Sequence, residues 1–300
     1  MTGRLVCTGQ VLLDLVMRVP ALPPVGGDVM ASATSLLPGG GFTVMAAAAR
    51  AGAAVVYAGG HGTGPYGDAV RTALAAEGIS AAAAPTPDED TGVCVVLVDD
   101  DGERTFVTGS GAEAGPLVPV PTGAGDVVHV SGYSLLADAK ADALLDRVER
   151  GAGTVLVDPG PLVTEIDAGR WARLLRRTDV LSVNAREARL LTGSDELRVA
   201  SAALAERVPV AIVRDGADGC LLTRDGRTEH VPGHRVTAVD TNGAGDAHCG
   251  VLAAALLDGA DLRTAARRAN VAAALAVTRP GPATAPTAAE VDALLPGARP

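Results

Sequence analysis

Residues 240–246 read Asp-Thr-Asn-Gly-Ala-Gly-Asp (DTNGAGD), and this stretch decides the fold that we predict for the chain. The strand-like run HRVTAV (234–239) precedes it, and an apolar run that ends at Leu257, before Gly259, follows it. The pattern predicts a strand, a turn that glycines permit, and a helix. Small residues at 243–245 leave the first N–H groups of such a helix uncovered, and uncovered N–H groups bind anions.

Asp246 falls in the first turn of that helix, where the helix dipole favours an ionised carboxylate. A carboxylate base beside a site for negative charge can move a phosphoryl group onto a hydroxyl. An ordinary strand-to-helix loop that ends in an aspartate explains the same letters equally well. The rest of the chain must therefore decide between the two interpretations.

A second GAGD motif shows that these four residues do not by themselves indicate a catalytic site. Residues 122–126 read TGAGD, but Pro121 replaces the leading aspartate and the β-branched run VVHV follows. This context predicts a strand directly after Asp126, so that no helix dipole acts on its carboxylate. We assign it no chemistry.

Composition narrows the functional classes. The chain has 300 residues, of which 48% are hydrophobic, enough for one large α/β domain or two small ones. A net charge of −10 argues against nucleic acid or an anionic membrane as a partner. The cysteines are scattered without a CxxC pair, so we expect a reduced, cytoplasmic protein. They are Cys7, Cys94, Cys220 and Cys249. We also expect no signal peptide and no membrane span.

Lys140 is the only lysine, and it lies in a charged segment (138–150) that is predicted to be helical. A Walker A loop, a protein-kinase strand lysine and a Schiff base each need a lysine in a particular loop or pocket. These three kinds of site are therefore excluded.

From residue 127 onward, strand-like and helical segments alternate regularly, which predicts a doubly wound, mostly parallel sheet. Ligands gather at the carboxyl ends of such strands, and Asn184 and Glu187 lie at one of them. Taken alone, these two residues are better explained as a helix-capping pair. The segment 210–222 predicts a strand, a tight turn and a strand.

The N-terminal part predicts a different kind of structure. Residues 4–12 form an apolar run that we expect to be a first core strand. The Pro- and Gly-rich stretch that follows predicts short strands outside the compact core, and two alternating runs around 100–102 predict a hairpin. Between these two regions, three glycines at 39–41 precede a segment that is predicted to be helical.

Gly62, Gly64 and Gly67 match the spacing of a dinucleotide-binding turn, which keeps a nicotinamide-dependent dehydrogenase as an alternative. Pro65 lies inside the turn, and the unit is not the first strand–helix pair of the chain. Tight binding of NAD would be required to support this alternative.

The DTNGAGD stretch resembles the C-terminal signature of the PfkB (ribokinase-like) carbohydrate kinases, usually DTTGAGD followed by a helix. The glycines at 39–41, the N-x-x-E at 184–187, the turn at Gly216 and Asn270 match the family in order over nearly all of the chain. The resemblance implies one three-layer α/β/α domain over residues 1–300, with a mostly parallel central sheet. It also implies a small β lid, inserted in the α/β core from about 11–38 and 91–110.

The resemblance further implies an ATP-dependent kinase that acts on a hydroxyl of a sugar or sugar derivative. Asp246 would be the base, and the amides of Gly243, Ala244 and Gly245 would form the anion hole. The acceptor would lie against Asp14, Gly39, Gly40, Gly41 and Arg104. ATP would lie against Asn184, Glu187, Arg214, Gly216, Asp218, Gly219 and Asn270. Glu187 would act on Mg²⁺ through water, and Asp240 and Asn242 would belong to a loop for a monovalent cation such as K⁺.

The acceptor end departs from the family pattern. Val44 stands where the family has an Asn that holds the acceptor, and Gly41 stands where ribokinases proper have Lys. The acceptor class therefore stays open between a sugar or sugar acid and a nucleoside, and a binding protein without turnover is a further alternative. No basic cluster accompanies the pocket motifs, which argues against a phosphorylated sugar. We also expect a homodimer through the lid.

Overall fold

The computed structural model describes residues 3–136 and 138–295, and its centre is a large sheet. The strands of this sheet are β1 (Leu5–Cys7), β4 (Val55–Tyr57), β5 (Ser80–Ala81), β8 (Val127–Ser131), β9 (Thr154–Asp158), β10 (Val180–Asn184), β11 (Val210–Arg214), β12 (Gly219–Arg224) and β13 (Arg227–Pro232). Their order is β13-β12-β11-β10-β9-β8-β1-β4-β5. All neighbours from β11 to β5 run parallel, whereas β12 and β13 extend one edge in antiparallel fashion.

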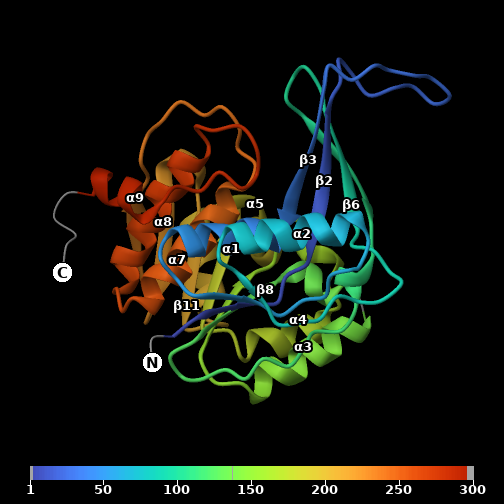
Figure 1. The fold of residues 1–300 in the computed structure, drawn as a ribbon. Coiled ribbons are helices and arrows are strands. Elements are labelled where there is room, and N and C mark those ends of the chain that lie inside the picture. Colours follow the sequence, from blue (N-terminus) through green and yellow to red (C-terminus); the bar gives the residue numbers. More distant parts are fainter. Residues whose placement is uncertain (1–2, 137, 296–300) are drawn as a thin grey trace.

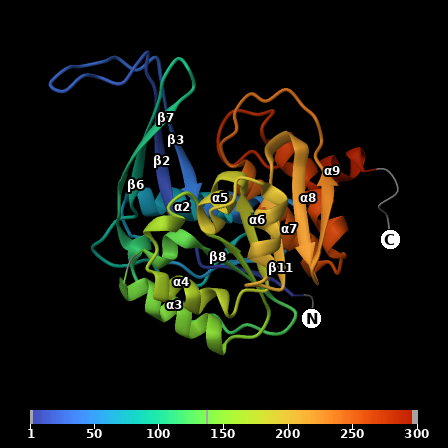
Figure 2. The same ribbon diagram turned by 180° about the vertical axis from the view of Figure 1, so that it is seen from behind.

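Helices cover both faces of the sheet, and Figures 1 and 2 show the two helix layers from opposite sides. One layer holds α1 (Gly41–Arg50), α2 (Pro65–Ala76), α7 (Ala244–Leu257) and α8 (Leu262–Ala276). The other holds α3 (Asp138–Arg150), α4 (Ala168–Leu175), α5 (Ala185–Thr192) and α6 (Leu197–Ala205). A separate apolar cluster lies under each layer. The predicted three-layer α/β/α architecture is confirmed.

The sequence explains why these segments take their places. The first four residues of β8 and of β11 are all buried, as expected for parallel strands that helices cover on both faces. Helices α1 and α7 approach closely because Gly250 faces the backbone of α1. A Cβ at Gly250 would lie 2.4 Å from the carbonyl oxygen of Val44. Val44 itself is buried in this contact.

A second sheet projects from the core as a lid (Figure 1). Its strands are β2 (Val11–Arg18), β3 (Ala33–Gly40), β6 (Val93–Val98) and β7 (Arg104–Gly109), in the order β3-β2-β6-β7. The hairpin expected around residues 100–102 is the antiparallel pair β6–β7. The expectation of one core strand over 4–12 is wrong, because β1 ends at Cys7 and Val11 already begins the lid strand β2.

The glycine-rich turn at 62–67 has no space for a dinucleotide. A Cβ at Gly62 would lie 2.3 Å from the carbonyl oxygen of Glu89. The carboxylate of Asp90 accepts hydrogen bonds from the N–H groups of Tyr66 (3.1 Å) and Gly67 (2.7 Å), at the start of α2. The anion site of that helix is therefore filled by the protein itself. The dinucleotide interpretation is wrong.

Two other predictions of local structure are confirmed. Asp126 lies just before β8, and its carboxylate accepts hydrogen bonds from the N–H groups of Arg4 and Gly123, both at 2.9 Å. Lys140 lies in α3, where its buried Nζ donates to the carbonyl oxygen of Glu113 at 2.9 Å. The lysine thus fixes a helix to a loop. No helix in the described ranges is long and apolar enough to cross a membrane.

Candidate active site

The carboxyl ends of β9, β10 and β11 meet the N-terminus of α7 at one edge of the sheet. Arg214, the last residue of β11, connects them: its Nη1 lies 2.9 Å from the Asp158 carboxylate and 3.1 Å from the carbonyl oxygen of Gly245. Its Nη2 lies 3.7 Å from the carboxylate of Glu187. Burial opposes the charge of this guanidinium, but the carboxylates of Asp158 and Glu187 raise its pKa above the usual value. The first turn of α7 is therefore held against a buried ionic network.

The turn before α7 requires a glycine. Gly243 has φ +75°, and a Cβ there would lie 2.0 Å from the carbonyl oxygen of Pro282. In the described chain no side chain caps α7, and the N–H of Ala244 makes only a long, 3.4 Å contact with the carbonyl oxygen of Thr241. The N-terminus of α7 thus keeps N–H groups for an anion.

Asp246 lies half-buried in this first turn. Burial raises its pKa to about 7, the charges of Asp158 and Asp14 add to this rise, and Arg214 opposes it. The helix dipole therefore does not keep the carboxylate fully ionised at neutral pH, contrary to the sequence-based expectation. A carboxyl group with a pKa near the working pH is well suited to take up a proton.

Asp14 faces the same space from the lid strand β2. A Cβ at Gly39 would lie 2.3 Å from an Asp14 carboxylate oxygen, so this glycine makes room for the carboxylate. Gly40 has φ +59°, and the N–H of Gly41 donates to the carbonyl oxygen of Gln10 at 2.6 Å, which fixes the start of α1. Burial raises the pKa of Asp14 to about 6. The glycines position the carboxylate and the helix next to it.

Asp240, at the other end of the 240–246 stretch, holds the loops of the site together. Its carboxylate accepts hydrogen bonds from the N–H groups of Asn242 (2.9 Å) and Gly281 (3.0 Å). It also forms an ion pair with Arg104 of β7. The lid and the core are thereby joined at the entrance to the turn.

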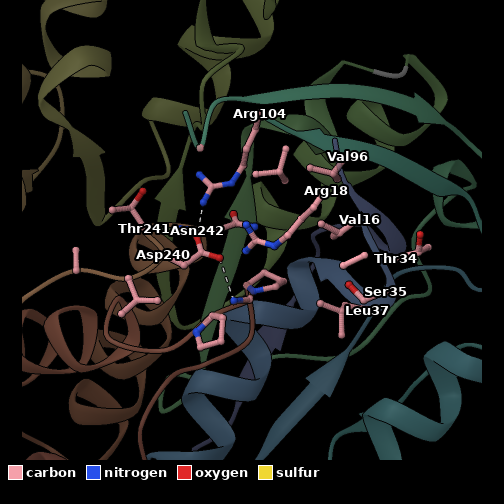
Figure 3. A pocket seen from close by; sticks show the side chains of 18 residues that line it. Val16, Arg18, Thr34, Ser35, Leu37, Val96, Arg104, Asp240, Thr241 and Asn242 are labelled. Atoms are coloured by element: carbon pink, nitrogen blue, oxygen red, sulfur yellow. Dashed lines mark hydrogen bonds and ion pairs between the residues drawn. The ribbon is translucent and has the colours of Figure 1, made fainter. Parts of the chain in front are cut away.

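A cavity of about 470 Å³, here called the lid cavity, lies between the lid and residues 238–242 (Figure 3). Val16, Arg18 and Arg104 line it from the lid, and Asp240 and Asn242 line it from the core. Figure 3 shows both guanidinium groups extending toward Asp240 and Asn242. The expectation that no basic residues gather at the pocket is therefore wrong.

A second cavity of about 420 Å³, here called the helix cavity, lies on the other side of the same stretch. Thr241 and Ala238 line both cavities, so residues 238–241 separate them. Small and apolar side chains of α8, such as Ala273, form one wall of the helix cavity. Five of the residues assigned to ATP also line it, namely Asn184, Arg214, Gly216, Gly219 and Asn270.

The sequence matches a family of known proteins along nearly its whole length. The model of the pfkB family of carbohydrate kinases matches residues 2–289. The chain belongs to this family. It is therefore a phosphotransferase with an alcohol group as acceptor.

Individual relatives cover the chain from end to end. An ATP-dependent ribose-1-phosphate kinase of Halopiger xanaduensis is 33% identical over 299 residues, which span 97% of this chain and 98% of the relative. The ribokinase of Thermotoga maritima superposes with a TM-score of 0.83 at 24% identity, and 98% of this chain and 99% of that one are covered. A nucleoside kinase of Methanocaldococcus jannaschii gives a TM-score of 0.84 at 18% identity, with 98% of each chain covered. The ribokinase-like fold is confirmed.

Eight of the predicted site residues line neither cavity, namely Asp14, Gly39, Gly40, Gly41, Glu187, Asp218, Gly243 and Asp246. The Asp218 side chain is 67% exposed, and its carboxylate lies 3.6 Å from Arg235. Glu187 is buried in a capping box, in which its carboxylate accepts from the N–H of Asn184 at 2.9 Å. Val44 is buried in α1, and its carbonyl oxygen faces Gly250 of α7.

Three further residues of the site were missed in the sequence. Asp158 ends β9 in the run VLVDPG, and its place at a strand end was a usable signal. Arg18 shares a face of β2 with Asp14, because side chains four apart on a strand point the same way. His248 is buried against the helix cavity, and neither ring nitrogen has a hydrogen-bond partner among the described residues. No sequence pattern indicated this last placement.

Proposed function

We propose that this kinase transfers the terminal phosphoryl group of ATP to a hydroxyl of a sugar or sugar derivative, with Asp246 as the base. One observation carries the proposal: the half-buried carboxylate of Asp246 stands in the first turn of α7, at an uncapped N-terminus whose residues Ala244 and Gly245 line the helix cavity, close to the stretch 238–241 that separates the two cavities. An acceptor in the lid cavity and a nucleotide in the helix cavity would meet at this point.

In the proposed reaction the acceptor oxygen attacks the terminal phosphorus, and the bond from that phosphorus to the bridging oxygen of ADP breaks. The acceptor proton passes to the Asp246 carboxylate, whose pKa of about 7 suits this role. The N–H groups of Gly243, Ala244 and Gly245 would stabilise the charge on the transferred group. Each is fixed in place before ATP binds, because Gly243 packs against Pro282.

The acceptor hydroxyl would be oriented by Asp14. This carboxyl group also titrates near neutrality, because burial raises its pKa to about 6. Gly39 gives it space, and β2 carries it on the cavity face of the lid. Closure of the lid would exclude water and so limit the hydrolysis of ATP.

The nucleotide would lie against the helix cavity. Asn270 of α8 donates from Nδ2 to the carbonyl oxygens of Val231 (2.9 Å) and Pro232 (3.1 Å), which holds the end of β13 at the cavity wall. Gly216 has φ +55° with open space around it, as suits a turn that a phosphate approaches. Asn184 and Arg214 would complete the polar side of this site, with Asp218 and Gly219 in the same turn.

The Mg²⁺ that accompanies ATP would not bind Glu187 directly. The Glu187 carboxylate accepts hydrogen bonds from the N–H and Nδ2 of Asn184 at 2.9 and 2.7 Å, and it is 2% exposed. These contacts fit a role through water. The Asp240 carboxylate is likewise occupied, so a K⁺ ion in the loop 240–242 would rely on other oxygens. Activity in potassium chloride, compared with tetramethylammonium chloride, tests this part of the proposal.

The decisive variant is Asp246→Asn, which keeps the shape of the side chain and removes its proton-accepting charge. We expect kcat to fall about 10²- to 10⁴-fold on a panel of sugars, sugar derivatives and nucleosides, with little change in ATP binding. Asp126→Asn, in the second GAGD motif, is the matched control and should keep full activity. Near-normal phosphorylation by Asp246→Asn would refute the proposal.

The same panel tests the alternatives. Preference for nucleosides would favour a nucleoside kinase of this family, the activity named for the Methanocaldococcus jannaschii neighbour. ATP binding without consumption of ATP on any acceptor would favour a binding protein that lacks turnover.

A further inference from the structure

The charges of the lid cavity are unusual for this protein. The chain carries a net charge of −10, yet the charged residues that line the lid cavity are Arg18, Arg104 and Asp240. Two guanidinium groups therefore face one carboxylate. A site for a neutral sugar would need no excess of positive charge, whereas an anionic ligand requires one.

Arg18 brings a charge that the protein does not use. In the described parts of the chain its guanidinium forms no hydrogen bond and no ion pair; only its backbone carbonyl is engaged, by Ser32. The side chain nevertheless extends over the cavity toward Asp240 and Asn242 (Figure 3). Arg18 ends the inner lid strand β2 and is exposed at the cavity, so its charge is accessible to a ligand there.

Arg104 can be shared between the protein and a ligand. Its partner Asp240 already accepts hydrogen bonds from the N–H groups of Asn242 and Gly281, so the carboxylate stays satisfied when the arginine turns away. The Arg104 side chain is 25% exposed, which weakens its ion pair. A guanidinium has donors enough to contact Asp240 and an oxyanion at once.

The lid sheet places the two arginines as a pair. Val98 is in register with Arg18 on β2 and with Arg104 on β7. The two arginines therefore share one face across a single intervening strand, roughly 10 Å apart at their Cα atoms. Long side chains can close that gap around one group that has several oxygens, such as a phosphate.

The same strand relates this pair to the reacting end. Asp14 and Arg18 lie four residues apart on one face of β2, which corresponds to about 13 Å along the strand. An acceptor with its hydroxyl at Asp14, which lies beyond the lining of the lid cavity, and its anionic group at the arginines would extend along β2 into that cavity. Ser35, in register with Val16 between them, adds a hydroxyl on this face.

We propose that the acceptor is a sugar that already carries a phosphate monoester, held by Arg18 and Arg104. The proposal deepens the proposed function and rests on it. The reaction is the same transfer: a free hydroxyl of the sugar phosphate attacks, ADP leaves, and the product is a sugar bisphosphate. The anionic group stays bound and takes no part in bond making.

The test compares pentoses and hexoses with their phosphate monoesters and their sugar acids. We expect kcat/KM for the best phosphate monoester to exceed that of its parent sugar by about 100-fold or more. Arg18→Gln and Arg104→Gln should each lower kcat/KM for the phosphate about 10- to 100-fold more than they lower it for the parent sugar. Arg18→Lys should recover part of the loss. Arg150→Gln, on the exposed face of α3, is the matched control.

Preference for a neutral sugar or a sugar acid, or an equal effect of Arg18→Gln on phosphate and parent sugar, would overturn the phosphate assignment while the kinase activity stood. Calorimetric titration of the wild-type protein and Arg18→Gln with the same sugar phosphates, without ATP, separates the two claims. Arginine-dependent binding without any turnover would keep this site and refute the proposed function.

Discussion

Arg104 of the lid strand β7 forms an ion pair with Asp240, the first residue of the DTNGAGD stretch, 136 positions further along the chain. The same carboxylate binds the N–H groups of Asn242 and Gly281. One aspartate thus joins the lid, the turn before α7 and the loop after α8. A substitution in the lid or in the core loops that breaks a contact of Asp240 should therefore alter the shape of the lid cavity.

Asp240 should therefore matter more for stability than its arginine partner. Asp240→Asn leaves one side-chain acceptor where two backbone N–H groups now bind, and we expect a loss of about 1–3 kcal/mol in the free energy of unfolding. Arg104→Gln removes a partly exposed pair and should cost under about 1 kcal/mol. Urea denaturation of both variants measures this order, and a larger loss for Arg104→Gln would contradict it.

The pH dependence should report the base. Asp246 must be deprotonated to accept a proton, and its pKa is raised to about 7. We expect kcat/KM to fall as the pH drops through about 7, with Asp14 adding a second loss near 6. A rate profile from pH 5 to 9 measures this, with ATP and acceptor binding followed separately. A flat profile down to pH 5 would exclude Asp246 as the base.

The same carboxylate should cost stability. Its folded pKa lies above the unfolded value, so the folded state is penalised as the pH rises from 4 toward 7, and the penalty is complete above 7. Asp246→Asn should therefore raise Tm, by roughly 2–4 °C per kcal/mol relieved. The gain should be larger at pH 8 than at pH 5. Calorimetry of both proteins at pH 5 and pH 8 measures this gain. A Tm of Asp246→Asn below that of the wild-type protein at pH 8 would contradict this account.

Gly243 should tolerate no side chain. Gly243→Ala forces a Cβ to within 2.0 Å of the Pro282 carbonyl oxygen at φ +75°, and we expect a loss of about 2–4 kcal/mol together with loss of activity. Gly193→Ala is the matched control, since Gly193 has φ +71° and open space around it. It should cost about 1 kcal/mol. Equal losses in the two variants would show that backbone strain alone explains the glycine.

The homodimer stays a prediction, and the lid offers the surface for it. Residues on the face of the lid sheet that points away from the cavity are apolar and incompletely buried, and the Val107 side chain is 64% exposed. They are Leu15, Met17, Leu36, Val95, Leu97 and Val107. We expect a dimer in light scattering, and a monomer for Val107→Asp.

Val25→Asp changes a still more exposed valine in the loop between β2 and β3 and should leave the dimer intact. A monomeric wild-type protein, or a dimeric Val107→Asp, would contradict this use of the lid.

The turn and the helix at residues 240–246 could be predicted because local contacts form them. The same holds for Asn184 and Glu187, which form a capping box three residues apart. The regular alternation after residue 127 fixed the parallel sheet in the same way, because each strand and helix carries its own apolar period. The strand expected over 234–239 is not formed, because β13 already ends at Pro232 and the chain is irregular from there to the turn before α7.

Only the tertiary structure decided the acceptor end. Arg18 and Arg104 are 86 residues apart and become neighbours through their pairing with Val98. The near-neutral pKa of Asp246 depends on burial and on Asp158, and no local pattern carries either one. The sequence states which residues carry a charged side chain. Which charges meet in one cavity, and what they stabilise, follows from how the lid folds back over the core.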